Sequence, residues 1–120
     1  MSKKAIVILS DPNNGEEALG RAFNGLGVAY DCKNSDEEVV ILFQGTGTRW
    51  PEVLQKEDHP IHALYSAVED KIKGVSSGCA DVFGADASGL DLITENQIPG
   101  TSGLPSFVNL QKEGFTVLTF

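Results

Sequence analysis

Two stretches of the chain, residues 5–9 and 39–43, consist entirely of apolar residues, with no polar residue inside either stretch. Continuous apolar runs of this length are typical of strands covered on both faces, as in a parallel sheet. Between the two runs, Leu19, Phe23 and Leu26 recur at helical spacing, after an acidic pair that favours the amino terminus of a helix. The pattern therefore predicts a strand, a helix and a second parallel strand.

The rest of the chain predicts further helices and strands in alternation. In residues 60–74, apolar side chains follow the spacing of an amphipathic helix. Residues 74–79 then suit a third parallel strand, and residues 84–103 are typical of short elements and loops. Proline opens and glycine closes a predicted helix over residues 105–114, and residues 115–120 form the last predicted strand.

The composition is that of an ordinary globular protein, and 120 residues fit one domain, which we take to span residues 1–120. Seventeen acidic residues against nine basic ones give a formal charge of -8, which repels nucleic acid and anionic membrane surfaces. The first apolar run is too short for a signal peptide, and no apolar stretch approaches the length of a membrane span. These features predict a cytoplasmic protein whose two cysteines are both thiols.

Chemistry is expected where the strands of a parallel sheet end. In open sheets of this kind, ligands bind outside the carboxyl ends of the strands, near the point where the strand order reverses. Three segments follow predicted strands and are expected to meet there. The candidate ligand-binding residues in them are Ser10, Asp11, Asn13, Gln44, Gly45 and Ala80, and the candidate catalytic residue is Cys79.

The spacing around Cys79 leaves two interpretations open. A thiol at the end of a strand lies near backbone N–H groups of the following turn, which stabilise a thiolate and make the sulfur nucleophilic. Asp81 brings negative charge close and no basic residue is adjacent, so a small buried cysteine is the second interpretation. Cys32 precedes the second strand, at the opposite end of a parallel sheet, which predicts a structural role.

Three other features carry weaker signals. Residues 44–48 contain two glycines but lack the spacing of a dinucleotide loop, so phosphate binding is not predicted. His59 and His62 have no third metal ligand at a recognisable spacing, which favours helix capping or the surface over a metal site. Arg49 and Trp50 either close over the pocket, fill a subunit interface or simply pack.

Several loose motifs follow one another in a characteristic order along the chain. The first strand runs into residues 9–12, an apolar second strand follows, and residues 74–80 form the third motif. The closing motifs are residues 98–100 and 113–120. In this order, which covers nearly the whole chain, they resemble the DsrE/DsrF-like (YchN-like) proteins.

The resemblance implies an α/β fold of three layers, flavodoxin-like, with a mostly parallel five-stranded sheet flanked by helices. It also implies a homo-oligomer, a trimer or a hexamer. No cofactor is predicted. Some members of the family are sulfur-relay proteins that carry sulfur as a cysteine persulfide, received from donor proteins and passed to acceptor proteins. Their carrier cysteine follows the strand that Cys79 is predicted to end, so the resemblance favours Cys79 as the carrier.

Two functions therefore remain open at the level of the sequence, and the chain is not assigned as an enzyme. The first is a sulfur carrier or transferase that acts through Cys79. The second is a non-catalytic protein of the same family that binds a small ligand or a protein partner, without sulfur transfer.

Overall fold

The computed structural model describes residues 2–120 and consists of a five-stranded sheet with helices on both faces. The strands are β1 (Lys3–Ile8), β2 (Glu38–Phe43), β3 (Ile72–Ser76), β4 (Leu92–Ile93) and β5 (Phe115–Thr119). The α-helices are α1 (Gly15–Asn34), α2 (Trp50–Leu54), α3 (His62–Val68), α4 (Ser77–Phe83) and α5 (Phe107–Lys112). Two 3-10 helices, η1 (Gly45–Arg49) and η2 (Glu69–Lys71), complete the elements.

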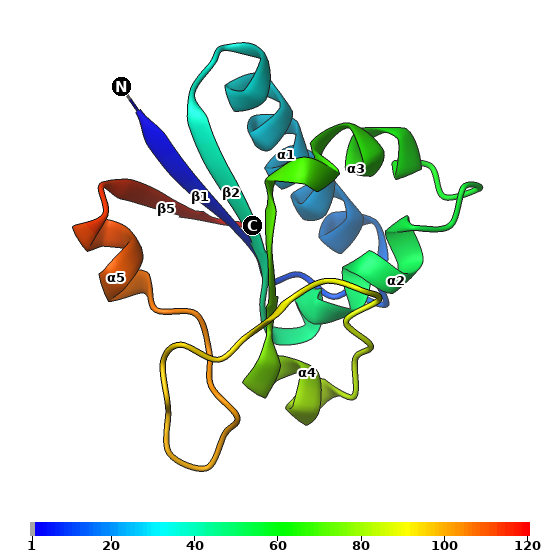
Figure 1. Cartoon of the computed structure of the whole chain (residues 1–120). Helices are drawn as coiled ribbons and strands as arrows, with labels where there is room; N and C mark the ends of the chain where they lie inside the picture. Colours follow the sequence, from blue (N-terminus) through cyan, green and yellow to red (C-terminus); the bar gives the residue numbers. More distant parts are fainter. Residues whose placement is uncertain (1) are drawn as a thin grey trace.

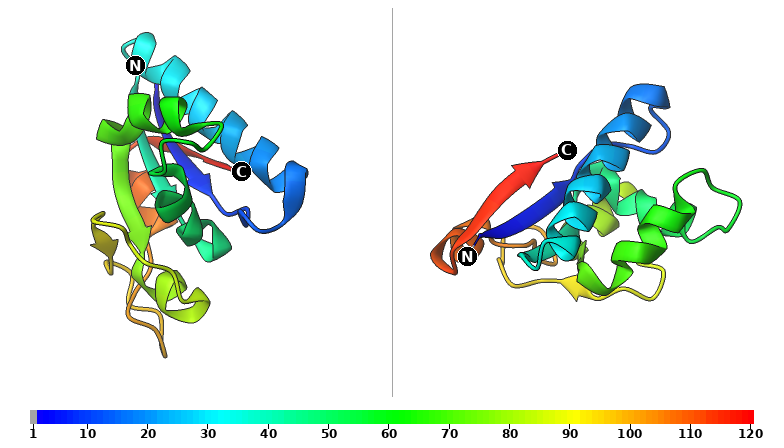
Figure 2. Two further views of the ribbon diagram at one scale, coloured as in Figure 1. Left: turned by 90° about the vertical axis from the view of Figure 1, so that its right-hand side faces the viewer. Right: turned by 90° about the horizontal axis from the view of Figure 1, so that it is seen from above.

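The sheet has helices on both of its faces, as Figures 1 and 2 show. Alternate residues of β2 point to opposite faces: Ile41 and Phe43 pack in the core beneath α1 and α3, whereas Leu42 packs in the core beneath α5. Because both faces of the sheet are covered, the side chains on both sides of the central strands are buried, which favours apolar residues at every position. This explains the uninterrupted apolar runs. The expected three-layer α/β fold with five strands is confirmed, and every strand pair is parallel.

The strands lie in the order β4-β3-β2-β1-β5, so the order reverses between β1 and β5. Successive strands from β1 to β4 are added on one side of β1, and the last strand, β5, returns to the other side. We call the edge where the carboxyl ends of the strands meet the carboxyl edge. In a doubly wound sheet the reversal point at this edge is the usual place for a ligand.

The prediction for residues 60–79 is wrong in its boundaries. The helix ends at Val68, a 3-10 turn follows, and Ile72 already pairs with Ile41 of β2. The third strand therefore begins two residues before Gly74 and ends at Ser76, where α4 starts. The apolar position of Ile72 fits the helical spacing by coincidence, because a buried strand start and a helix face both require an apolar residue there.

Two features of the connections have no counterpart in the predicted elements. Residues after β2 fold into η1 and α2, and η1 packs beside α4. Residues 94–104 form a loop closed by two backbone hydrogen bonds between Asn96 and Leu104. Within residues 2–120, none of the helices is both long and apolar enough to cross a lipid bilayer.

Candidate functional site

Cys79 lies in the first turn of α4. This helix directly follows β3 at the carboxyl end of the strand (Figure 1). Ser76 ends the strand and is the N-cap of the helix, and its hydroxyl accepts a hydrogen bond from the Cys79 N–H at 3.3 Å. This cap lets the chain pass from strand to helix without a loop. Cys79 is partly exposed and forms no disulfide. The thiol thus sits at the carboxyl edge, on a helix rather than on the end of a strand.

The 94–104 loop holds the first turn of α4 in place. The Gly78 N–H donates to the Gly103 carbonyl at 2.7 Å, and a side chain at Gly78 would crowd Leu104 and Thr101 of the loop. The N–H groups of Gly78 and Cys79 are thus both bound to acceptors of the chain itself. These are the backbone donors expected to stabilise a thiolate, and the structure has them engaged elsewhere.

A chain of hydroxyls keeps Asp81 on the side of α4 away from the thiol. The Ser102 hydroxyl donates to the Asp81 carboxylate at 2.7 Å, and the Ser77 hydroxyl lies 2.7 Å from the Ser102 oxygen. Since the single proton of Ser102 goes to Asp81, Ser77 must donate to Ser102. Residues two apart lie on opposite sides of a helix, so Cys79 faces away from this network.

The face of α4 that carries Cys79 is apolar and open to solvent. Val82 and Phe83 follow Cys79 by three and four residues, which places the three side chains on one face. Val82 is 71% exposed, and Phe83 is also exposed. The thiol is therefore bordered by apolar surface, not by the nearest carboxylate in the sequence.

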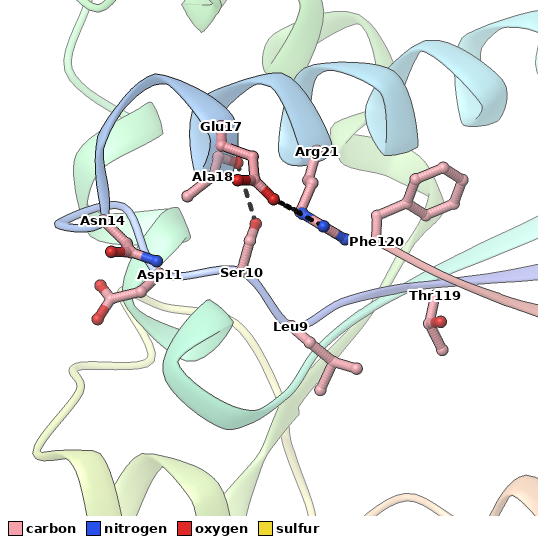
Figure 3. A pocket seen from close by; sticks show the side chains of 9 residues that line it. All are labelled: Leu9, Ser10, Asp11, Asn14, Glu17, Ala18, Arg21, Thr119 and Phe120. Carbon is pink, nitrogen blue, oxygen red and sulfur yellow. Dashed lines mark hydrogen bonds and ion pairs between the residues drawn. The ribbon is translucent and has the colours of Figure 1, made fainter.

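A cavity of about 370 Å³ lies at the reversal point between β1 and β5, against the first two turns of α1 (Figure 3). The Ser10 hydroxyl donates to the Ala18 carbonyl at 3.1 Å, and Glu17 and Arg21 form an ion pair at 2.8 Å beside it. Polar groups outweigh apolar ones in the lining. The polar side chains of the lining are Ser10, Asp11, Asn14, Glu17, Arg21 and Thr119.

The structure brings only part of the predicted residues together. Ser10 and Asp11 line the cavity, whereas Asn13 does not. The backbone N–H of Asn13 donates to the Asp11 carboxylate at 2.9 Å. Gln44 follows β2 and is 7% exposed, and its Oε1 has no hydrogen-bond partner within residues 2–120.

Gly45 and Ala80 do not reach the cavity either. Gly45 begins η1, and Ala80 is buried in the core beneath α4. Cys79 lies in α4, which follows β3, and β3 is separated from β1 by β2, so the cavity and the thiol are two places on the carboxyl edge. Whether any of these residues binds a ligand stays a prediction.

Arg49 is the residue that connects these two places, and its pairing with Asp11 and Phe83 goes beyond the roles of pocket closure, subunit contact or packing that the sequence left open for it. Its guanidinium donates from Nη1 to the Asp11 carboxylate at 2.9 Å and from Nη2 to the Phe83 carbonyl at 3.3 Å. These partners are 38 and 34 residues away along the chain. Trp50 beside it is buried in the core, where its Nε1 donates to the Ser10 carbonyl at 2.7 Å.

Cys32 and the histidines have structural surroundings. Cys32 is 4% exposed, in the last turn of α1, and burial raises the pKa of its thiol. His62 donates from Nδ1 to the Leu54 carbonyl at 2.7 Å, which ties α3 to α2. His59 accepts a hydrogen bond from the Ile61 N–H at 3.2 Å. Both imidazoles are thus engaged in hydrogen bonds with the backbone, and neither side chain caps α3, whose N-cap is Ile61.

Comparisons with known proteins agree with this fold. The model of the DsrE/DsrF-like family matches residues 2–120. No curated protein matches the chain. Among solved structures, the crystal structure of the YchN protein from E. coli is similar, with a TM-score of 0.53 over 98% of this chain and 99% of that chain. The sequence identity is 20%, so this likeness concerns the fold alone. Because the family model spans nearly the whole chain, the protein belongs to the DsrE/DsrF-like family.

Proposed function

We propose that this protein is a sulfur carrier that holds sulfur as a persulfide on Cys79. The observation that carries the proposal is a free, partly exposed thiol in the first turn of α4, at the carboxyl edge of a DsrE/DsrF-like fold. The sequence resemblance described above points to the same residue. Cys32 is a poor alternative because its sulfur is buried and its thiol pKa is raised.

The proposed step moves one sulfur atom without net oxidation. The Cys79 thiolate attacks the outer sulfur of a donor persulfide, a new S–S bond forms at Cys79, and the S–S bond of the donor breaks. The donor leaves as a thiolate and takes up a proton from water. In the second step an acceptor thiolate attacks the outer sulfur on Cys79, and Cys79 leaves as the thiolate it was at the start.

The surroundings of the thiol are compatible with protein donors and acceptors. The exposed apolar side chains of Val82 and Phe83 border Cys79 and offer contact area to another protein. The proposal includes a homo-oligomer, a trimer or a hexamer, as the resemblance implies. It also includes a reducing compartment such as the cytoplasm, because the carrier thiol must be free between transfers.

Mass spectrometry of the intact protein tests the proposal. The reduced chain is incubated with a low-molecular-weight persulfide, and we expect a gain of the mass of one sulfur atom that dithiothreitol removes. Cys79→Ser is expected to abolish the gain. Cys32→Ser, the matched control, is expected to retain it, because the buried Cys32 sulfur takes no part. An unchanged mass of the native chain, or a gain that follows Cys32 rather than Cys79, would refute the proposal.

A second candidate function, binding of a small polar ligand without covalent chemistry, is favoured by the cavity at the reversal point. The same experiment separates the two functions. A ligand-binding protein is expected to keep its mass after exposure to the persulfide. It is also expected to release a small molecule when protein purified under native conditions is denatured before mass spectrometry.

A further inference from the structure

The basic residues of this acidic chain are unevenly placed around the sheet. Most of the nine lie at or next to the amino ends of strands, far from the carboxyl edge; these are Lys3, Lys4, Lys33, Lys71, Lys73 and Lys112. Many of them are paired there with carboxylates, as in the contacts of Lys4 with Glu37 and of Lys33 with Asp70. Arg49, in contrast, lies at the carboxyl edge and contacts α4, the helix that carries Cys79.

Two partners fix the guanidinium of Arg49 while leaving it open to solvent. Asp11 accepts from Nη1 at 2.9 Å, and the Phe83 carbonyl accepts from Nη2 at 3.3 Å. The guanidinium carbon lies 5.9 Å from the centre of the Phe83 ring, in cation–π contact. The Arg49 side chain is still 33% exposed, so a molecule that approaches α4 can reach part of it.

The Phe83 ring links Arg49 to the face of α4 that bears the thiol. Cys79 and Phe83 are four residues apart, so their side chains are neighbours on one face, and Arg49 stacks on the Phe83 ring. Asp81 is closer to Cys79 in the sequence, but its carboxylate is bound by Ser102 on the opposite face. The carboxylate of Asp11 forms an ion pair with Arg49, and its negative charge cancels part of the electric field of the guanidinium.

We propose that Arg49 is a specificity-determining residue that favours anionic sulfur donors and acceptors at Cys79, and that Asp11 moderates this preference. The inference rests on the proposed function of Cys79 as a carrier. The substrate class is a thiol or persulfide with a carboxylate close to its sulfur, which an acidic protein of charge -8 otherwise repels. The thiolate that leaves in each transfer is also an anion and is stabilised by the same guanidinium.

Alkylation by two reagents of different charge tests this preference. Iodoacetate is anionic and iodoacetamide is neutral, and both modify a thiolate, so the ratio of their rates at Cys79 measures the local field. The rates are followed by peptide mass spectrometry, which separates Cys79 from Cys32. Because the neutral reagent responds equally to exposure and to thiolate content, the ratio corrects for any loosening of the fold.

Replacement of Arg49 and replacement of Asp11 are expected to change the ratio of the two alkylation rates in opposite directions. Arg49→Gln lowers the iodoacetate to iodoacetamide ratio by about threefold, and Asp11→Asn raises it by a similar factor, as expected for one screened charge near a surface. Arg49→Lys, which keeps the charge, retains most of the native ratio. A pair with a purely structural role would move both variants in the same direction.

Two results would overturn the inference, and they differ in what they imply for sulfur transfer. An equal ratio in the native chain and in both variants, or a change of the same sign in both, removes the role of Arg49 but leaves Cys79 reactive. Failure of both reagents to modify Cys79 in the native chain removes both proposals. The expected ratios in a chain that gains no sulfur from a persulfide would sustain the charge preference and refute the carrier function.

Discussion

Single residues at the carboxyl edge determine how closely the chain segments approach one another. Gly47 in η1 lies against the backbone of β1, where a side chain carbon would collide with the Ile8 carbonyl oxygen and lie 2.8 Å from the Ile8 carbonyl carbon. Only glycine allows this approach, and it sets the place of Arg49 two residues later. The close approach of η1, the element that carries Arg49, to β1 therefore depends on the absence of a side chain at Gly47.

Replacement of this glycine is expected to destabilise the protein. Gly47→Ala lowers the free energy of unfolding by about 1 to 3 kcal/mol, because backbone atoms of β1 and η1 must move apart. Gly20→Ala is the matched control: Gly20 lies within α1 with nothing within 4 Å of the added carbon, and alanine there stabilises the helix by about 0.5 to 1 kcal/mol. Denaturant unfolding measures both changes, and equal effects of the two substitutions would contradict this account.

At the scale of elements, α4 is held by a loop as well as by its own strand. The helix has only seven residues, too few for its own backbone hydrogen bonds to keep it stable without tertiary contacts. The 94–104 loop adds a backbone hydrogen bond to Gly78 and the hydroxyl contacts between Ser102 and the side chains of Ser77 and Asp81. The geometry around Cys79 thus depends on residues more than twenty positions later in the chain.

Removal of one hydroxyl is expected to loosen this attachment. Ser102→Ala deletes both side-chain hydrogen bonds and leaves the buried Ser77 hydroxyl without its acceptor, at a cost of about 1 kcal/mol. Hydrogen exchange of the Gly78 amide, which donates to Gly103, is expected to become faster. Ser66→Ala serves as the control, because within residues 2–120 the side-chain hydrogen bond of Ser66 is to the His62 ring, on an exposed part of α3. Unchanged exchange at Gly78 in Ser102→Ala would show that the backbone contact alone holds the helix.

The sequence predicts elements with simple patterns better than it predicts their junctions. The central strands and α1 follow from long, uniform patterns, and the number of strands came from the family resemblance. The start of α4 was missed because Ser76, Ser77 and Gly78 carry weak propensities, and the deciding interactions are a cap and a contact from the 94–104 loop. Arg49 was seen only as part of a possible contact, because its two partners are distant in sequence.

At the scale of the whole molecule, ion pairs join segments at the end of the sheet opposite to Cys79. Lys4 at the start of β1 pairs with Glu37 before β2 at 2.9 Å, and Lys33 at the end of α1 pairs with Asp70 before β3 at 2.8 Å. The hydrogen bond from Lys4 lowers the pKa of Glu37 below its usual value of 4.5, and that from Lys33 lowers the pKa of Asp70 below 3.8. Both carboxylates therefore favour the folded state when they are ionised.

The stability of the protein is expected to fall in acid for this reason. A carboxyl group with a lowered pKa in the folded state contributes its full stabilisation above its unfolded pKa, and the contribution is lost as the pH falls through the folded value. The loss therefore begins near pH 4.5 and continues below pH 3.8. The pKa of Lys4 is raised above 10.5, chiefly by its hydrogen bond to Glu37, so the stabilisation from Lys4 is lost only as the pH rises above that value.

Urea unfolding at a series of pH values tests this dependence. The double variant Glu37→Gln and Asp70→Asn is expected to be less stable than the native chain near neutral pH and to converge with it below pH 3.8. Glu52→Gln, an exposed glutamate of α2 with no ion pair within residues 2–120, is expected to follow the native curve. A constant difference between the double variant and the native chain at every pH would rule out the ion pairs as the cause.

The direct passage from β3 into α4 at Ser76 has a consequence for protein engineering. With no linker between strand and helix, the backbone at position 79 is positioned by the pairing of β3 in the sheet together with the contacts of the 94–104 loop. A different side chain or a chemical label introduced at position 79 is therefore attached to a backbone of defined position. The chain therefore offers a rigid attachment point whose orientation is known in advance from the register of β3.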